Sequence, residues 1–197
     1  LQRIESQKGE LIEELQEDMK EMLRNVQIGA ERSAEIVKGL KSFARTDNQE
    51  SQFIQVQELL ESTLVILGAQ LTQIQVVKNY DYQFEIPCYP GQLNQVFMNI
   101  ISNSVYAMKE QGEIEITISE FEDNVLIAIK DSGEGISEEV ISSIFNPFFT
   151  TKDVGEGTGL GLSIVYGIIE RHQGKIWAES KKGEGACFYI SLPKYSN

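Results

Sequence analysis

Residues 10–45 carry apolar or small side chains at intervals of three and four positions, on an otherwise charged background. This spacing puts those side chains on one side of a helix, so the pattern predicts one long helix with a continuous apolar seam. No second long helical pattern follows to cover the seam, which favours an intermolecular bundle over packing against the chain's own domain. The seam positions are Leu11, Leu15, Met19, Met22, Val26, Ala30, Ser33, Val37, Leu40 and Ala44.

Beyond a polar linker at residues 46–52, short strand-type runs alternate with helical patterns. Strands are predicted at 53–56, 73–80, 113–119, 125–130, 174–180 and 186–192. The strand 113–119 alternates with period two and is expected to form a hairpin with 125–130, and 174–180 to form a second hairpin with 186–192 over the turn 181–185. Helices are predicted at 58–71, 91–109 and 160–169, and a broken sheet edge at 86–90. The expected fold class is α+β: a two-layer α/β sandwich whose mixed, mostly antiparallel sheet has helices on one face, preceded by the long helix. We place the domain boundary in the linker, between residues 1–47 and 48–197.

The composition indicates a soluble globular protein with one core: the chain has 197 residues, 41% hydrophobic and 24% charged. A net charge of −13 argues against a nucleic-acid-binding surface. No apolar run approaches the ~20 residues that span a bilayer and no signal peptide is evident, so a cytoplasmic location is expected, with membrane anchoring of the parent protein left open. The chain begins with Leu1, which suggests a fragment. Cys88 and Cys187 lack metal-ligand spacing and are expected to be reduced.

A glycine-containing stretch, Asp-Ser-Gly-Glu-Gly-Ile at residues 131–136, directly follows the apolar run 125–130. Asp131 is therefore expected where a strand ends. Gly133 and Gly135 can adopt positive φ and let the backbone approach a ligand closely. The alternative for Asp131 is a cap of a plain turn.

A second glycine-rich stretch, residues 155–163, opens onto the predicted helix 160–169. The start of that helix offers free N–H groups and a positive dipole end to phosphates. No Lys-Ser/Thr pair follows the glycines, which excludes a Walker loop. A dinucleotide fingerprint fails as well, because Leu160 stands where a glycine is required.

Two asparagines on the predicted helix 91–109, Asn99 and Asn103, are four positions apart and therefore share one helix face. The asparagine pair is followed by Asp-x-Gly-x-Gly, a phenylalanine-rich box at 144–152 and Gly-x-Gly-x-Gly. Taken in this order, the motifs resemble the ATP-binding domain of sensor histidine kinases, relatives of gyrase, Hsp90 and MutL. The resemblance runs from about residue 53 to residue 193, and residues 28–45 resemble the second helix of the dimerisation domain of these kinases.

The resemblance implies a Bergerat-type fold that binds ATP and Mg²⁺. It implies that Asp131 accepts a hydrogen bond from the adenine amine and that Asn103 holds Mg²⁺ against the phosphates, as suits a hard cation. Residues 150–157 would form a lid over the triphosphate, with Lys152 contacting the phosphates and Phe145, Phe148 and Phe149 anchoring one end. The implied binding residues are Asn103, Asp131, Gly133, Gly135, Ile136, Phe149, Thr151, Gly157, Thr158, Gly159, Leu160 and Gly161.

Asn99 aligns with the position at which the hydrolases of the wider family carry a glutamate that activates water. An amide oxygen is not basic enough to serve as a general base. The catalytic residues expected are therefore Asn99, Asn103 and Lys152, in a site that transfers phosphate rather than hydrolysing ATP.

Two departures from the kinase pattern stand out. The final Gly-x-Gly-Thr motif of these kinases is Gly-Glu-Gly-Ala here, and Ala186 removes a polar partner for adenine, a loss of about 1 kcal/mol. Tyr106 stands three residues after Asn103, where many relatives carry Lys or Arg. Phosphate contact is therefore expected to rest more heavily on Lys152.

The phosphoacceptor histidine of such kinases lies on the first dimerisation helix, whereas the one histidine of this chain, His172, follows the second glycine box. We interpret His172 as structural and expect the acceptor on a helix outside this chain. The resemblance further implies a homodimer and onward transfer to an aspartate of a response regulator, with no nucleic-acid or membrane contact by this fragment. The alternatives are a degenerate nucleotide-binding docking module, an ATPase of the gyrase or Hsp90 type and, more distantly, a serine/threonine kinase of the anti-sigma type.

Overall fold

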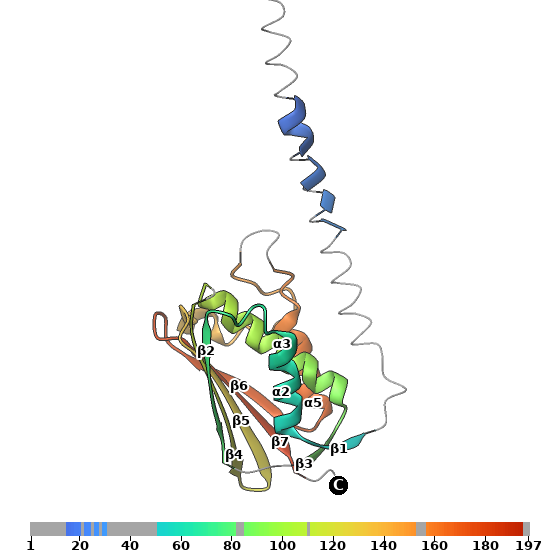
Figure 1. Ribbon diagram of the computed structural model, residues 1–197, viewed down its shortest axis with the longest axis vertical. Coiled ribbons are helices and arrows are strands. Elements are labelled where there is room, and N and C mark those ends of the chain that lie inside the picture. The colour runs from blue at the N-terminus through green and yellow to red at the C-terminus, as the bar shows by residue number, and fades with distance from the viewer. Residues whose placement is uncertain are drawn as a thin grey trace, which may run out of the picture. The chain divides into compact units, whose positions relative to one another are not determined.

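The computed structural model describes most of the chain (Figure 1), namely residues 15–20, 22–24, 26–27, 29–30, 51–81, 85–109, 111–152 and 157–194. These residues fall into two compact units. One unit takes in the described part of 1–44 together with 150–158, and the other the described part of 45–149 with 159–197. Each unit is described by itself.

The larger unit is built on a five-stranded sheet with the strand order β2-β4-β5-β7-β6. β2 and β4 are parallel, and the other neighbours are antiparallel. The two predicted hairpins are both present, as β4–β5 and β6–β7. The strands are β2 (Ile74–Tyr80), β4 (Gly112–Phe121), β5 (Asn124–Asp131), β6 (Lys175–Ser180) and β7 (Ala186–Pro193).

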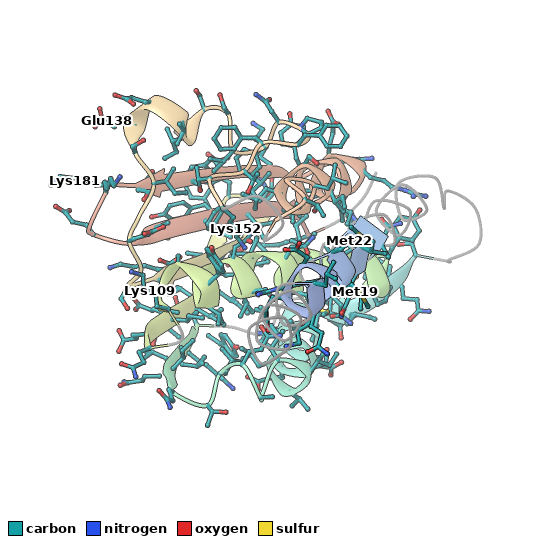
Figure 2. All side chains as sticks on the ribbon, turned by 90° about the horizontal axis from the view of Figure 1, so that it is seen from above. Met19, Met22, Lys109, Glu138, Lys152 and Lys181 are labelled. Atoms are coloured by element: carbon teal, nitrogen blue, oxygen red, sulfur yellow. The ribbon has the colours of Figure 1, made fainter. Side chains whose placement is uncertain are left out.

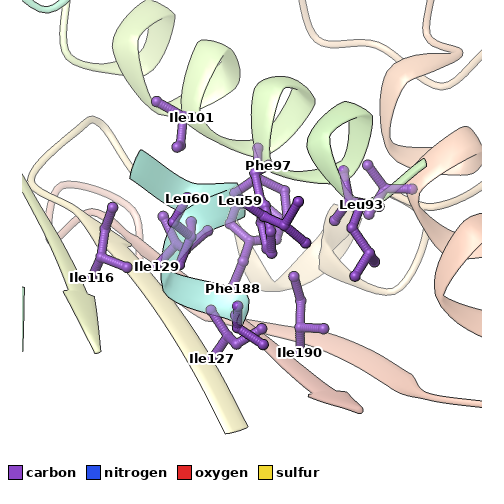
Figure 3. Packing of buried hydrophobic residues seen from close by; sticks show 14 of the residues in the cluster. Leu59, Leu60, Leu93, Phe97, Ile101, Ile116, Ile127, Ile129, Phe188 and Ile190 are labelled. Carbon is purple, nitrogen blue, oxygen red and sulfur yellow. The ribbon is translucent and has the colours of Figure 1, made fainter. Parts of the chain in front are cut away.

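Three helices cover one face of this sheet (Figure 1): α2 (Val56–Ile66), α3 (Pro90–Ala107) and α5 (Gly161–Arg171). Period-two alternation in the strands sends every second side chain toward these helices, so Ile127 and Ile129 of β5 are fully buried. Phe97 of α3 packs over them beside Leu60 of α2 (Figure 3). The predicted sandwich, with a mixed sheet and helices on one face, is confirmed.

Residues 86–90 differ from the prediction of a broken sheet edge. β3 (Glu85–Cys88) is a regular strand and pairs with β1 (Gln52–Gln55) in a separate two-stranded antiparallel sheet. Pro87 is tolerated because a strand in so small a sheet has an edge side where no N–H is needed.

The helix predicted at 58–71 also differs, since α2 begins at Val56 and ends at Ile66. Residues 67–73 are turns, in which the N–H of Leu67 still bonds the Thr63 carbonyl. The N–H of Gly68 donates to the Val65 carbonyl, three residues earlier, at 3.2 Å, so the last turn tightens and the α-helical pattern ends. A four-residue helix, α4 (Glu138–Ile141), was not predicted.

In the smaller unit, the described residues between 15 and 30 are helical, as the spacing predicts. Leu15, Met19, Met22 and Val26 of the seam are all more than half exposed (Figure 2 labels Met19 and Met22). The remaining seam positions other than Ala30 lie outside the described residues. No helix among the described residues is long and apolar enough to cross a membrane.

Candidate nucleotide-binding site

Asp131 ends β5 and is 3% exposed. Its Oδ1 accepts hydrogen bonds from the backbone N–H of Gly133, at 2.9 Å, and of Ala186, at 3.2 Å. Its Oδ2 accepts a third, from the Ser104 hydroxyl at 3.0 Å. Because the donors come from the following turn, from β7 and from α3, the carboxylate is held in one orientation.

The turn that follows Asp131 lies against two other elements. The N–H of Glu134 donates to the Ala107 carbonyl oxygen at the end of α3, at 3.2 Å. The carbonyl oxygen of Glu134 accepts from the N–H of Gly183, at 2.7 Å, in the turn between β6 and β7. This turn of the chain is therefore clamped between the helix end and the second hairpin.

The two glycines of this turn are required by close packing. A Cβ on Gly133 would lie 2.9 Å from the Ala107 Cβ. Gly135 has φ +67°, and a Cβ there would lie 2.2 Å from the carbonyl oxygen of Lys181, which Figure 2 labels on the β6–β7 hairpin. A side chain at either position would force the turn away from its supports.

Ile136 closes the turn. Its N–H donates to the Ser180 hydroxyl at 2.7 Å, and that hydroxyl donates to the Gly185 carbonyl at 2.6 Å. The Ile136 side chain packs against the hydrophobic core. The backbone that would line a base beside Asp131 is thus fixed at both ends.

Asn99 and Asn103, both half-buried on α3, differ in their contacts. The Asn99 amide donates to the Gly161 carbonyl at 3.2 Å, which ties the middle of α3 to the first residue of α5. The Asn103 side chain has no hydrogen bond within the part of the chain that the structure describes. The amide of Asn103 is therefore available to a ligand, whereas that of Asn99 is engaged.

The second glycine stretch brings two distant backbone segments together. Gly159 has φ +67°, and a Cβ there would lie 2.4 Å from the carbonyl carbon of Phe148. Leu160 is the N-cap residue of α5, and no side chain caps the first turn of this helix. The N–H groups in the first turn of a helix suit an anion. Phe149 is partly buried against the core, as an anchor would be.

Thr151, Lys152, Gly157 and Thr158 belong to the smaller unit. Within it, the Lys152 N–H donates to the Thr150 hydroxyl at 3.1 Å. A Cβ on Gly157 would lie 3.0 Å from the Lys152 Cδ and from the Thr150 Oγ1. The roles of these four residues at the nucleotide stay predictions.

His172 is buried and uses both ring nitrogens. Nε2 accepts from the backbone N–H of Tyr89, at 3.1 Å, so Nδ1 carries the proton and donates to the Ile168 carbonyl at 2.7 Å. Burial lowers the pKa of this imidazole. The ring therefore links the residue before α3 to the last turn of α5 in its neutral form.

Sequence reasoning missed Ser104, Ala107 and Ser180, which position Asp131 and its turn. Ser104 offered one signal: it occupies a core position of α3, in register with Ile100, Ile101 and Val105, where an apolar side chain is the rule. A buried hydroxyl must find a partner, and the partner here comes from another strand. Nothing in the spacing marked the other two.

These features define a domain with a helix-covered sheet and a carboxylate presented beside glycine-rich turns. A family model described as histidine kinase-, DNA gyrase B- and HSP90-like ATPase matches residues 88–196, more than half of the chain. The chain belongs to this family. The resemblance to the sensor histidine kinase catalytic domain is thereby confirmed.

The individual relatives are kinases by name. The chain is 42% identical over 146 residues to sporulation kinase E of Bacillus subtilis (strain 168), covering 72% of the chain and 20% of that protein. The nucleotide-free catalytic domain of histidine kinase ThkA superposes with a TM-score of 0.68 at 34% identity, over 74% of this chain and 97% of that one. A structure of ThkA in complex with the response regulator protein TrrA superposes with a TM-score of 0.71 at 30% identity, over 85% of this chain and 48% of that one. The chain thus spans between 19% and 36% of the length of the curated relatives it matches.

Proposed function

We propose that this chain is the ATP-binding catalytic part of a sensor histidine kinase. It binds ATP with Mg²⁺ and transfers the γ-phosphate to a histidine on a dimerisation helix outside this chain. The observation that carries the proposal is the buried Asp131 carboxylate, which accepts from three donors at the end of β5 in a domain of this family. Residues 1–47 would belong to the dimerisation domain and residues 48–197 to the catalytic domain.

The carboxylate of Asp131 suits the amine of adenine. A carboxylate has room for about four hydrogen bonds, and the three observed contacts leave room for one more. An amino group supplies the missing donor, whereas the carbonyl that guanine carries at the same position would face the carboxylate with like partial charge. Gly133, Gly135 and Ile136 would form the wall beside the base.

The phosphates would meet the start of α5 and the second glycine stretch. Gly159, Leu160 and Gly161 would present backbone N–H groups, and Lys152 would add a point charge, with Thr151, Gly157 and Thr158 beside it. The available amide oxygen of Asn103 fits a hard cation that takes its other ligands from phosphates and water. When bound, Mg²⁺ neutralises charge on the transferring phosphoryl group. No cluster of three or more His, Cys, Asp or Glu that would hold a metal exists among the described residues.

Transfer is favoured over hydrolysis by the state of Asn99. Its amide is not a base, and its N–H₂ group already donates to the Gly161 carbonyl. A water molecule near the phosphates would therefore find no group at this position to remove its proton. Catalysis would rest on positioning and charge neutralisation, with a histidine as acceptor.

The remaining partners follow from the relatives. We propose that the phosphate passes from the acceptor histidine to an aspartate of a response regulator, and the complex of ThkA with TrrA supports this choice. The exposed apolar seam at Leu15, Met19, Met22 and Val26 supports a homodimer formed through the helical segment. The parent protein would act in the cytoplasm.

Nucleotide titration of the unchanged chain and of Asp131→Asn, with and without Mg²⁺, tests the proposal. In the variant the amide oxygen keeps the acceptor role toward Gly133 and Ala186, but the amide N–H₂ faces the adenine amine, donor against donor. We expect micromolar binding of ATP by the unchanged chain and loss of at least tenfold in the variant, about 1.4 kcal/mol.

Glu134→Gln is the matched control, because Glu134 is exposed on the same turn and holds its contacts through backbone atoms. Calorimetry should show ATP binding by this control as in the unchanged chain. No binding by the unchanged chain would contradict the kinase proposal and leave a docking module as the better description.

A further inference from the structure

We propose that Ser104 is a positioning residue that sets the base selectivity of the site. Its hydroxyl orients Asp131 so that the pair presents acceptors to the base and selects a ligand with an amino group over one with a carbonyl. This inference rests on the proposed function and deepens it. Ser104 directly follows Asn103 on α3, and its role emerges from the contact between α3 and β5.

The contact is buried and specific. Ser104 is 1% exposed and Asp131 is 3% exposed, and the hydroxyl donates to Oδ2 at 3.0 Å. Oδ1 is already occupied by the backbone N–H groups of Gly133 and Ala186. Oδ2 is therefore the oxygen with capacity for a ligand, and Ser104 is the residue that fixes its direction.

The hydroxyl forgoes a local partner to make this contact. A serine or threonine inside a helix ordinarily donates to the carbonyl three or four residues earlier. Ser62 and Thr63 of α2 do so, both donating to the Leu59 carbonyl, at 2.9 and 2.8 Å. Ser104 instead donates to Asp131 on β5. Its hydrogen bond therefore positions another side chain as well as pairing the buried hydroxyl.

The consequence concerns which atoms face the base. A hydroxyl has one proton and two acceptor lone pairs. With the proton committed to Oδ2, only lone pairs of Ser104 and Asp131 remain for a ligand. An adenine amine finds acceptors there, whereas the carbonyl of hypoxanthine, the base of inosine, meets oxygen lone pairs. Without the Ser104 hydroxyl, Oδ2 loses its fixed orientation, and a water molecule can occupy the space that the hydroxyl leaves.

A serine at position 186 would supply a hydroxyl to Asp131 from β7 instead of from α3. Ala186 stands directly opposite Asp131 in the β5–β7 register, and cross-strand partners point to the same face of a sheet. Its side chain is a buried methyl group without a hydroxyl. A serine at this position would lie beside the same carboxylate from the other side, so it should replace the contact that Ser104→Ala removes.

The experiment compares the binding of ATP and inosine triphosphate, which differ at the base, by the 197-residue chain and by Ser104→Ala. We expect the variant to bind ATP about fivefold more weakly, as for loss of one buried hydrogen bond, with inosine triphosphate little changed. The ratio of the two affinities should therefore fall. Adding Ala186→Ser to Ser104→Ala should restore most of the ratio.

Thr63→Val is the matched control, because it removes a helical hydroxyl that is equally buried, 0% exposed, but serves only Leu59. It should lower the unfolding temperature without changing the affinity ratio. Ser104→Cys keeps the size and weakens the donor, so it carries the test if Ser104→Ala does not fold. An unchanged ratio of ATP to inosine triphosphate affinity in a folded Ser104 variant would overturn the role of Ser104 but leave the proposed function standing. An equal fall of this ratio in Thr63→Val would do the same. A chain that binds neither nucleotide would overturn the proposed function as well.

Discussion

His172 shows how one buried side chain makes stability depend on pH. Its hydrogen bonds to Tyr89 and Ile168 require the neutral ring, and burial lowers its pKa below the ordinary value of 6.5, with Arg171 adding to the effect. The unfolded chain therefore takes up a proton at a higher pH than the folded chain does. The contribution of His172 to the free energy of unfolding should be fully present above pH 6.5 and should fall as the pH drops below that value.

Urea unfolding of the unchanged chain and of His172→Gln, across this pH range, measures the effect. A glutamine can accept from the Tyr89 N–H but does not titrate, so the difference in stability between the two proteins should shrink with falling pH. The chain has one histidine, which makes the difference specific to this residue. A constant difference across the range would show that the ring is not held neutral.

Single residues also mark the limit of what could be foreseen. Asp131 was predictable because an acidic residue after an apolar run and before two glycines is a local pattern. The difference between Asn99 and Asn103 was not, because it depends on where Gly161 lies in space. The spacing of four positions puts both amides on one face but leaves open which of them has a partner.

The turn after β5 is an element whose shape depends on its supports. Gly135 and Gly183 both have positive φ, +67° and +87°, but only a Cβ on Gly135 would meet another atom. We expect Gly135→Ala to lower the free energy of unfolding by about 3 kcal/mol, through strain and collision with the Lys181 carbonyl. Gly183→Ala should cost about 1 kcal/mol, since it adds strain alone.

Chemical denaturation of the two variants under one set of conditions separates these contributions. Nucleotide binding by Gly135→Ala should weaken as well, because the turn that would line the base must move. Equal losses of stability in the two variants would show that backbone strain, rather than the contact with the second hairpin, accounts for the requirement for glycine.

Elements with a clear period were predicted well, and elements without one were not. β4 alternates with period two, and β5, β6 and β7 are strand-type runs bounded by turn residues, so their hairpins could be predicted from the chain. β3 has four residues including Pro87, too few for a period to show, and it forms only because β1 pairs with it. Whether β3 forms therefore depends on its pairing with β1 and cannot be predicted from its own four residues.

At the scale of the whole molecule, the proposed kinase should act on a histidine that it does not carry. We expect this chain, mixed with Mg²⁺, γ-labelled ATP and a separate two-helix dimerisation domain bearing the acceptor, to label that domain. The label should be acid-labile, as a phosphohistidine is, and should be absent from the chain itself. Asn103→Ala should abolish labelling, because the proposed Mg²⁺ contact is lost.

His172→Gln is the control for that assay. His172 has both nitrogens engaged in the folded chain, so its replacement should leave transfer to the supplied domain intact once folding is verified. Release of inorganic phosphate faster than transfer would support an ATPase instead. Label on His172 would contradict the structural interpretation of this residue.

The sequence by itself determined the α+β class, the hairpins and the location of Asp131 and the glycine turns, because these depend on local periodicity and on residues with particular backbone freedom. The helical seam was also visible, since its period is local. Tertiary structure alone decided which donors meet the Asp131 carboxylate, that Ser104 is one of them, and that His172 joins α3 to α5. These contacts join residues far apart along the chain, and their pairing follows from how the sheet and helices pack, which no local pattern records.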